Sequence, residues 1–171
     1  QIEPLLSGGT GSVSHTEEVP SFLPDRFEPG TPNIPGILGL HAALCDLEQT
    51  DMDKLHQHEL ELTQYFINGL MQMDPSESTL RAIGKHNTIE RTSVVSVQTL
   101  QTDMARVAYE MDDTYGIMTR VGLHCAPSAH KTLGTYPEGT IRFSFGPENT
   151  HHEVDLALHA LAEITGSPYH L

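Results

Sequence analysis

One cysteine in the chain stands among residue types that activate a thiol. Cys125 lies in the run Arg120-Val-Gly-Leu-His-Cys-Ala-Pro127, directly after a predicted strand. The cation of Arg120, a protonated imidazole at His124 and a helix start after Pro127 would each favour the thiolate, which is the nucleophilic form of cysteine. Cysteine is also among the residues most often buried, so simple packing in the core is the alternative. The sequence thus offers Cys125 as a candidate nucleophile.

A second candidate is Arg142, which lies in the alternating run from Ile141 to Phe145. Alternation with period two is the pattern of a half-buried strand, so Arg142 is expected on the face opposite Ile141 and Phe143. A guanidinium there can hold a substrate carboxylate through two parallel hydrogen bonds, a geometry that lysine does not offer. A surface ion pair is the alternative, because the chain holds 23 Asp and Glu residues. The residues alone leave both open.

Two further patterns carry weaker signals. The run from Ser7 to Ser12 is rich in glycine, but it lacks the Gly-Lys-Ser/Thr ending of a phosphate-binding loop and precedes no predicted helix. His41 and Cys45 stand one helical turn apart, yet no third and fourth ligand follow at the spacing of a metal site. We therefore expect a flexible loop at the glycines and no bound metal.

The residues after position 75 alternate between strand and helix patterns. A helix stripe runs from Met104 to Met111, and Thr150 and Glu153 form a capping box that begins a last helix at about 151–165. Strands are predicted at residues 80–83, 93–99, 117–121 and 141–145. Strands separated by helices predict the α/β class, here a small two-layer sandwich with helices on one face of one sheet.

The N-terminal part has a different character. Residues 1–36 are dense in proline and glycine, which predicts an irregular arm, and its apolar residues predict packing against something other than the rest of this sequence. Residues 37–74 fit two helices. The first runs from Ile37 to Gln49, and the second begins after Thr50 as its N-cap and ends at Asp74 before a proline.

Composition narrows the class of protein and its partners. A length of 171 residues fits about one domain. The formal charge of −14, from 9 Lys and Arg against 23 Asp and Glu, argues against nucleic acid and anionic membrane surfaces as partners. No apolar run approaches the ~18 residues of a membrane span. With only Cys45 and Cys125, and no signal-peptide pattern, we expect a reducing, cytoplasmic location.

Three strings, in order along the chain, carry a family resemblance. They are RFEPGTPN at residues 26–33, RVGLHCAP at residues 120–127 and GTIRFSFGPENTHHEVD at residues 139–155. Together they resemble the C-terminal portion of cysteine desulfurases, in the class V aminotransferase group of fold type I pyridoxal-phosphate enzymes. The resemblance covers essentially the whole chain. It implies an arm from the end of the large cofactor-binding domain (1–36), connecting helices (37–74) and a small C-terminal α/β domain (75–171).

The resemblance also implies roles for single residues. Cys125 matches the catalytic cysteine, which takes sulfur from L-cysteine as a persulfide and leaves alanine. Arg142 matches the arginine that binds the substrate α-carboxylate, and Arg120 and His124 match substrate-site residues of the cysteine loop.

The cofactor implied by the resemblance is pyridoxal phosphate. Thr31 and Gly30 match a segment that reaches into the partner subunit's cofactor pocket in a homodimer, with Thr31 near the phosphate. In the family, the lysine that binds the cofactor lies upstream of the glycine run. We therefore expect it to precede Gln1, and this chain alone to be inactive.

Several readings of the activity stay open. A selenocysteine lyase would take selenocysteine in place of cysteine, and a class V aminotransferase would not need Cys125. A noncatalytic alternative is a dimerisation or sulfur-relay piece. A sulfur-acceptor protein is an expected partner of the desulfurase, and the sequence does not identify it.

Overall fold

The computed structural model of the chain describes residues 2–13 and 15–168. These divide into two compact units, residues 1–50 and residues 51–171, and each is described by itself. Among the described residues, no helix is long and apolar enough to cross a membrane.

The first unit holds irregular backbone followed by the helix α1 (Ile34–Gln49). The helix begins three residues before the predicted start, because Pro35 fits the first helical turn and Asn33 Oδ1 accepts a hydrogen bond from Gly36 N at 3.1 Å. None of its residues is buried in the described chain. Apolar side chains of the arm are exposed too, with Leu5 fully so.

The second unit is built on one antiparallel sheet. Its strand order is β1-β2-β4-β3, and the bounds are β1 (Leu80–Ile83), β2 (Val94–Thr99), β3 (Arg120–Gly122) and β4 (Thr140–Ser144). All four strands were predicted, but β3 begins three residues late. The reason is that Gly116 is left-handed and Ile117 N donates to Met111 O at 2.8 Å, so these residues still close the preceding helix.

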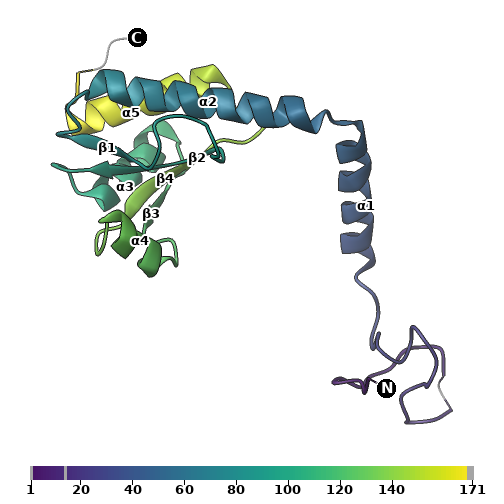
Figure 1. The fold of residues 1–171 in the computed structure, drawn as a ribbon. Helices are drawn as coiled ribbons and strands as arrows, with labels where there is room; N and C mark the ends of the chain where they lie inside the picture. The colour runs from purple at the N-terminus through teal and green to yellow at the C-terminus, as the bar shows by residue number, and fades with distance from the viewer. Residues whose placement is uncertain (1, 14, 169–171) are drawn as a thin grey trace. The chain divides into compact units, whose positions relative to one another are not determined.

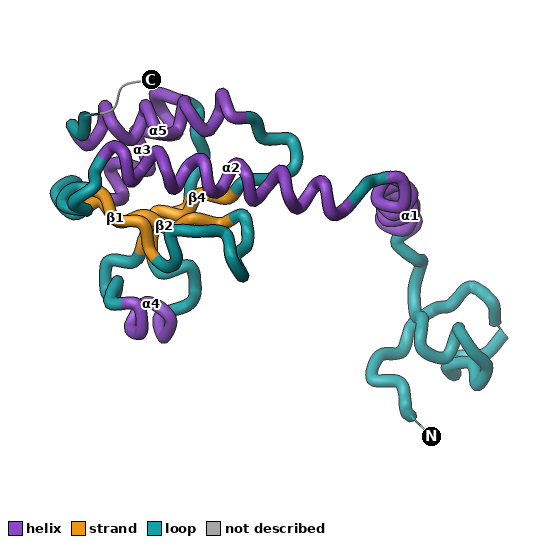
Figure 2. Tube along the Cα trace, turned by 45° about the horizontal axis from the view of Figure 1, so that its top comes forward, coloured by secondary structure: helices purple, strands orange, loops and turns teal. Residues whose placement is uncertain are grey.

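Three helices cover one face of this sheet and a fourth lies on the other side (Figures 1 and 2). The covering helices are α2 (Met52–Met73), α3 (Met104–Tyr115) and α5 (His151–Thr165), and the short α4 (Pro127–Leu133) lies in the connection from β3 to β4. The capping box of Thr150 and Glu153 is confirmed at the start of α5. The N-cap of α2 is Asp51, and the predicted Thr50 instead ends α1.

The core lies between the sheet and these three helices. Phe66 of α2 packs against Phe143 and Phe145, with ring centroids 4.7 and 5.3 Å apart. A Cβ built on Gly69 would lie 2.3 Å from Leu158 Cδ1, so α2 and α5 meet at close range. The sequence grouped α2 with the connecting helices, whereas this packing makes it part of the same compact unit as the sheet.

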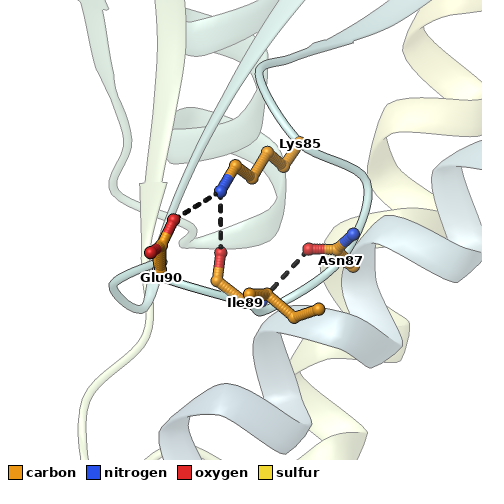
Figure 3. Close-up of polar contacts among 4 residues, drawn as sticks. All are labelled: Lys85, Asn87, Ile89 and Glu90. Carbon is orange, nitrogen blue, oxygen red and sulfur yellow. Dashed lines mark hydrogen bonds and ion pairs between the residues drawn. The ribbon is translucent and has the colours of Figure 1, made fainter.

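The loop that joins β1 and β2 is closed by polar contacts of its own (Figure 3). Lys85 Nζ lies 2.9 Å from Glu90 Oε2, and Asn87 Oδ1 accepts a hydrogen bond from Ile89 N at 3.1 Å. Arg91 donates to Val94 O at 3.2 Å, directly at the start of β2. The loop therefore fixes where β2 begins.

Candidate active site

The sheet face opposite the covering helices carries the predicted arginines. Arg142 pairs in register with Ser96 of β2 on one side and with Arg120 of β3 on the other. Its neighbours Ile141 and Phe143 are buried in the core. Arg142 therefore lies on the polar face, as the alternation predicts.

Arg120 and Arg142 bring two positive charges together on this face. Among the described residues, neither forms an ion pair with an acidic side chain, and the buried Nε of Arg142 has no hydrogen-bond partner. Like charges directly opposite one another in a sheet are destabilising, and buried polar atoms ordinarily have partners. The pair therefore suits an anion such as a carboxylate, and within the described part of the chain Arg142 forms no surface ion pair.

Cys125 lies at the tip of a tight turn that follows β3. The turn is closed by a hydrogen bond from Ala126 N to Leu123 O at 2.8 Å, and His124 and Cys125 have φ values of 49° and 59°. Positive φ at both central positions is the geometry of a type I′ turn, which ordinarily takes glycine or asparagine. The Cys125 side chain is exposed and unpaired, so it is not a packed core thiol. As predicted, a helix, α4, starts at Pro127.

His124 is held between the sheet and α4. Its Nε2 lies 3.2 Å from Thr140 Oγ1, and its ring centroid lies 5.8 Å from that of His130. Burial, and then the charges of Arg142, His130 and Arg120, lower the pKa of His124. These surroundings favour the neutral imidazole over the protonated form considered from the sequence.

The remaining candidates belong to the first unit. Gly30 has a φ of 90° and its N–H donates to Gly9 O at 2.8 Å, so the glycine run contacts the segment that carries Thr31. Thr31 is exposed. Cys45 Sγ lies 3.8 Å from His41 Nδ1, and within the described ranges no group of three or more His, Cys, Asp or Glu residues could hold a metal ion.

Three buried residues behind the cysteine turn were not predicted from the sequence. Thr140, Thr135 and His130 are 1%, 0% and 6% exposed, and His130 Nδ1 lies 2.7 Å from Thr135 Oγ1. One signal was available for Thr140, because it stands two positions before Arg142 and so shares its face of the strand. Nothing in the sequence indicated that His130 would lie against His124.

Comparisons with known proteins agree on one family. The model of the aminotransferase class-V family matches residues 1–157. A probable cysteine desulfurase of Pyrococcus abyssi is 34% identical over 97% of this chain and 40% of its own length. Another, from Synechocystis, is 35% identical over 94% of this chain and 37% of its own length. The chain thus spans about 40% of the length of the curated relatives that it matches.

Solved structures give the same result. The apo cysteine desulfurase of Thermococcus onnurineus superposes with a TM-score of 0.76 and 32% identity, over 95% of this chain and 39% of that one. The cysteine desulfurase CsdA of Escherichia coli, in its S-sulfonic acid form, gives a TM-score of 0.68 and 26% identity, over 94% and 38%. The predicted α/β fold of a fold type I enzyme part is therefore confirmed, and the chain belongs to the aminotransferase class-V family.

Proposed function

We propose that this chain is the part of a pyridoxal-phosphate-dependent cysteine desulfurase that supplies the sulfur-accepting thiol and the carboxylate-binding arginine. The observation that carries the proposal is the arrangement around β3. Arg120 begins the strand beside Arg142, and the turn that follows the strand exposes Cys125.

The residues present fit a cofactor and substrate that carry anionic groups. The unpartnered buried Nε of Arg142 and the neighbouring Arg120 suit the substrate α-carboxylate. The exposed hydroxyl of Thr31, beside Gly30, would hold a phosphate oxygen of the cofactor in the partner subunit of a homodimer. When bound, pyridoxal phosphate supplies electron withdrawal from the substrate α-carbon.

In this proposal Cys125 acts as the nucleophile toward the substrate's sulfur. Its thiolate attacks the Sγ of L-cysteine, an S–S bond forms, and the Cβ–Sγ bond of the substrate breaks. The electron pair of the broken bond stays with the carbon, which takes up a proton to become the methyl group of alanine. Sulfur is oxidised and carbon is reduced within the same step, so no outside oxidant is needed.

Two enzymatic alternatives use the same fold. A selenocysteine lyase would share the arginines, and a class V aminotransferase would do without the thiol. The exposed position of Cys125 on a turn with two left-handed residues favours a use for the thiol. Arg120 and Arg142 are neighbours in register and form no ion pair among the described residues, which favours a carboxylate-binding role over a purely dimerising piece.

The same proposal extends to partners and location. A persulfide on an exposed turn can pass its sulfur to an acceptor protein, as a desulfurase requires. Both cysteines are free thiols, which supports a reducing, cytoplasmic location.

Alanine release tests the proposal in the holoenzyme that contains this chain. With L-cysteine as substrate, Cys125→Ser should abolish alanine release, whereas Cys45→Ser should leave it within about twofold of the parent, because Cys45 lies in α1. Alanine release at the parent rate by Cys125→Ser would favour a lyase that does not need the thiol, and amino transfer without alanine would favour the aminotransferase.

A further inference from the structure

We propose that Thr140 is a positioning residue for Cys125. Its hydroxyl holds the ring of His124, and through His124 it holds the turn that presents the thiol. The inference rests on the proposed function and adds a residue that supports the nucleophile without touching the substrate.

The cysteine turn needs support from outside itself. His124 and Cys125 both adopt positive φ, a conformation that costs free energy for residues other than glycine. Within the turn, the hydrogen bond from Ala126 N to Leu123 O at 2.8 Å offsets part of that cost. A conformation of this kind persists when surrounding residues hold it.

The first support comes from the start of β4. Thr140 is 1% exposed, and its Oγ1 lies 3.2 Å from His124 Nε2. The residue before it, Gly139, meets the other end of the turn, because a Cβ built on Gly139 would lie 2.3 Å from the C and O atoms of Gly122. Thr140 therefore contacts His124 within the turn, and Gly139 lies close to Gly122 at the end of β3, just before the turn.

This segment is itself fixed from the sheet. Gln98 of β2 is 7% exposed, and its Nε2 donates to Gly139 O at 3.2 Å. Its Oε1 accepts a hydrogen bond from Arg81 of β1. The position of Gly139, and with it that of Thr140, is thus determined by strands on the far side of β4.

The second support for His124 comes from α4. The buried His130 is oriented by its hydrogen bond with Thr135 Oγ1 and lies with its ring against that of His124. This contact positions the imidazole ring without giving its nitrogen atoms a hydrogen bond. Thr140 is therefore the polar contact that fixes the His124 ring, since His124 Nδ1 has no partner among the described residues.

One strand then serves both halves of the proposed site. Thr140 and Arg142 share a face of β4, two positions apart. In the proposal Thr140 supports the cysteine turn, and Arg142 binds the substrate carboxylate. Loss of the Thr140 hydroxyl should disturb the thiol and spare the arginine. The expected signature is a lower kcat with an unchanged KM.

The experiment compares Thr140→Val with Thr140→Ser, which keeps the hydroxyl. The matched control is Thr63→Val, because Thr63 is fully buried on α2 and its hydroxyl donates to Glu59 O at 2.8 Å, away from the site. Two quantities are measured for each variant: the rate of persulfide formation in the holoenzyme, as kcat and KM, and the hydrogen exchange of the Ala126 amide in the full chain without substrate.

Thr140→Val should lower kcat about tenfold with KM within about twofold, and should speed exchange at Ala126 about tenfold, the effect of losing one hydrogen bond of ~1.4 kcal/mol. Thr140→Ser should restore both to within about twofold, and Thr63→Val should change neither. Parent-like kcat and exchange in Thr140→Val would overturn the proposal, as would an equal effect of Thr63→Val. If the parent itself forms no persulfide, the proposed function fails, and the exchange measurement still decides whether Thr140 holds the turn.

Discussion

Arg120 and Arg142 face each other in register on β3 and β4, and no acidic side chain among the described residues forms an ion pair with either. The two guanidinium groups therefore lie side by side on one face of the sheet without an acidic partner from the described residues. A substrate carboxylate would supply the negative charge that this pair lacks.

Arg142→Gln should weaken the binding of L-cysteine in the holoenzyme. A hydrogen-bonded contact to a charged group contributes about 1.5–3 kcal/mol, so KM should rise about ten- to a hundredfold. Arg142→Lys should not restore binding, because an ammonium lacks the two-pronged geometry. Arg106→Gln is the matched control, since Arg106 pairs with Glu110 on the exposed side of α3. Equal KM values for Arg142→Gln and the control would remove Arg142 from the substrate site.

The ring of His124 should titrate below its ordinary pKa of 6.5. Burial and the charges of Arg142, His130 and Arg120 oppose its protonation, so Arg142→Gln should move its pKa upward. Because the unfolded chain binds the proton more readily, the contribution of His124 to stability is lost as the pH falls from about 6.5 toward the lowered pKa. Ring-proton NMR across this range measures the titration. A parent pKa at or above the ordinary value would contradict the described surroundings.

Asp74→Asn should destabilise the second unit. Burial would raise the pKa of Asp74, but hydrogen bonds from the N–H groups of Leu80 and Thr79 and from Ser76 Oγ hold it far below its usual range. Hydrogen bonds to a charged group contribute about 1.5–3 kcal/mol, so the free energy of unfolding should fall by about that amount.

The same carboxylate should make stability depend on acid. Its folded pKa lies below the unfolded value, so its contribution is present above pH ~4 and is lost as the pH falls further. Denaturant unfolding at pH 7 and pH 3 should show a smaller difference between parent and Asp74→Asn at pH 3. Asp112→Asn, on the exposed side of α3, serves as control. A pH-independent difference would mean that these hydrogen bonds do not require the charge of Asp74.

Gly139→Ala should cost more than an ordinary glycine replacement. The new Cβ would lie 2.3 Å from the backbone of Gly122, and the φ of 82° already disfavours a side chain, so a loss of at least ~2 kcal/mol in unfolding free energy is expected. Gly146→Ala is the comparison, because the nearest atom to its Cβ is 3.9 Å away and no positive φ is involved. Thermal unfolding of the two variants checks the difference. Equal losses would show that Gly122 and Gly139 do not meet closely.

The elements of the second unit were predictable because local signals suffice for them. The capping box at Thr150 fixes the start of α5, and alternation assigns Ile141 to the core and Arg142 to the opposite face. The start of β3 was not predictable. Ile117 is a residue type that favours strands, yet its N–H donates to Met111 O and so ends α3.

The sequence offers candidate residues for the site, but it does not predict their geometry. Cys125 and Arg142 stand out by type and spacing. The contact between His124 and Thr140 depends on how β4 and α4 pack, across 16 positions of sequence. Histidine and cysteine are not the residues that a type I′ turn prefers, so neither indicates the left-handed turn. The lowered pKa of His124 follows from the same packing, which no local pattern records.

The central claim is that Cys125 accepts the sulfur of L-cysteine. The most direct test exposes the holoenzyme that contains this chain to L-cysteine, labels persulfides with an alkylating reagent and maps the label by mass spectrometry of the peptides. The account predicts one added sulfur atom on the peptide of Cys125, none on the peptide of Cys45, and alanine released in equal amount. An unmodified Cys125 in enzyme that has released alanine would contradict it.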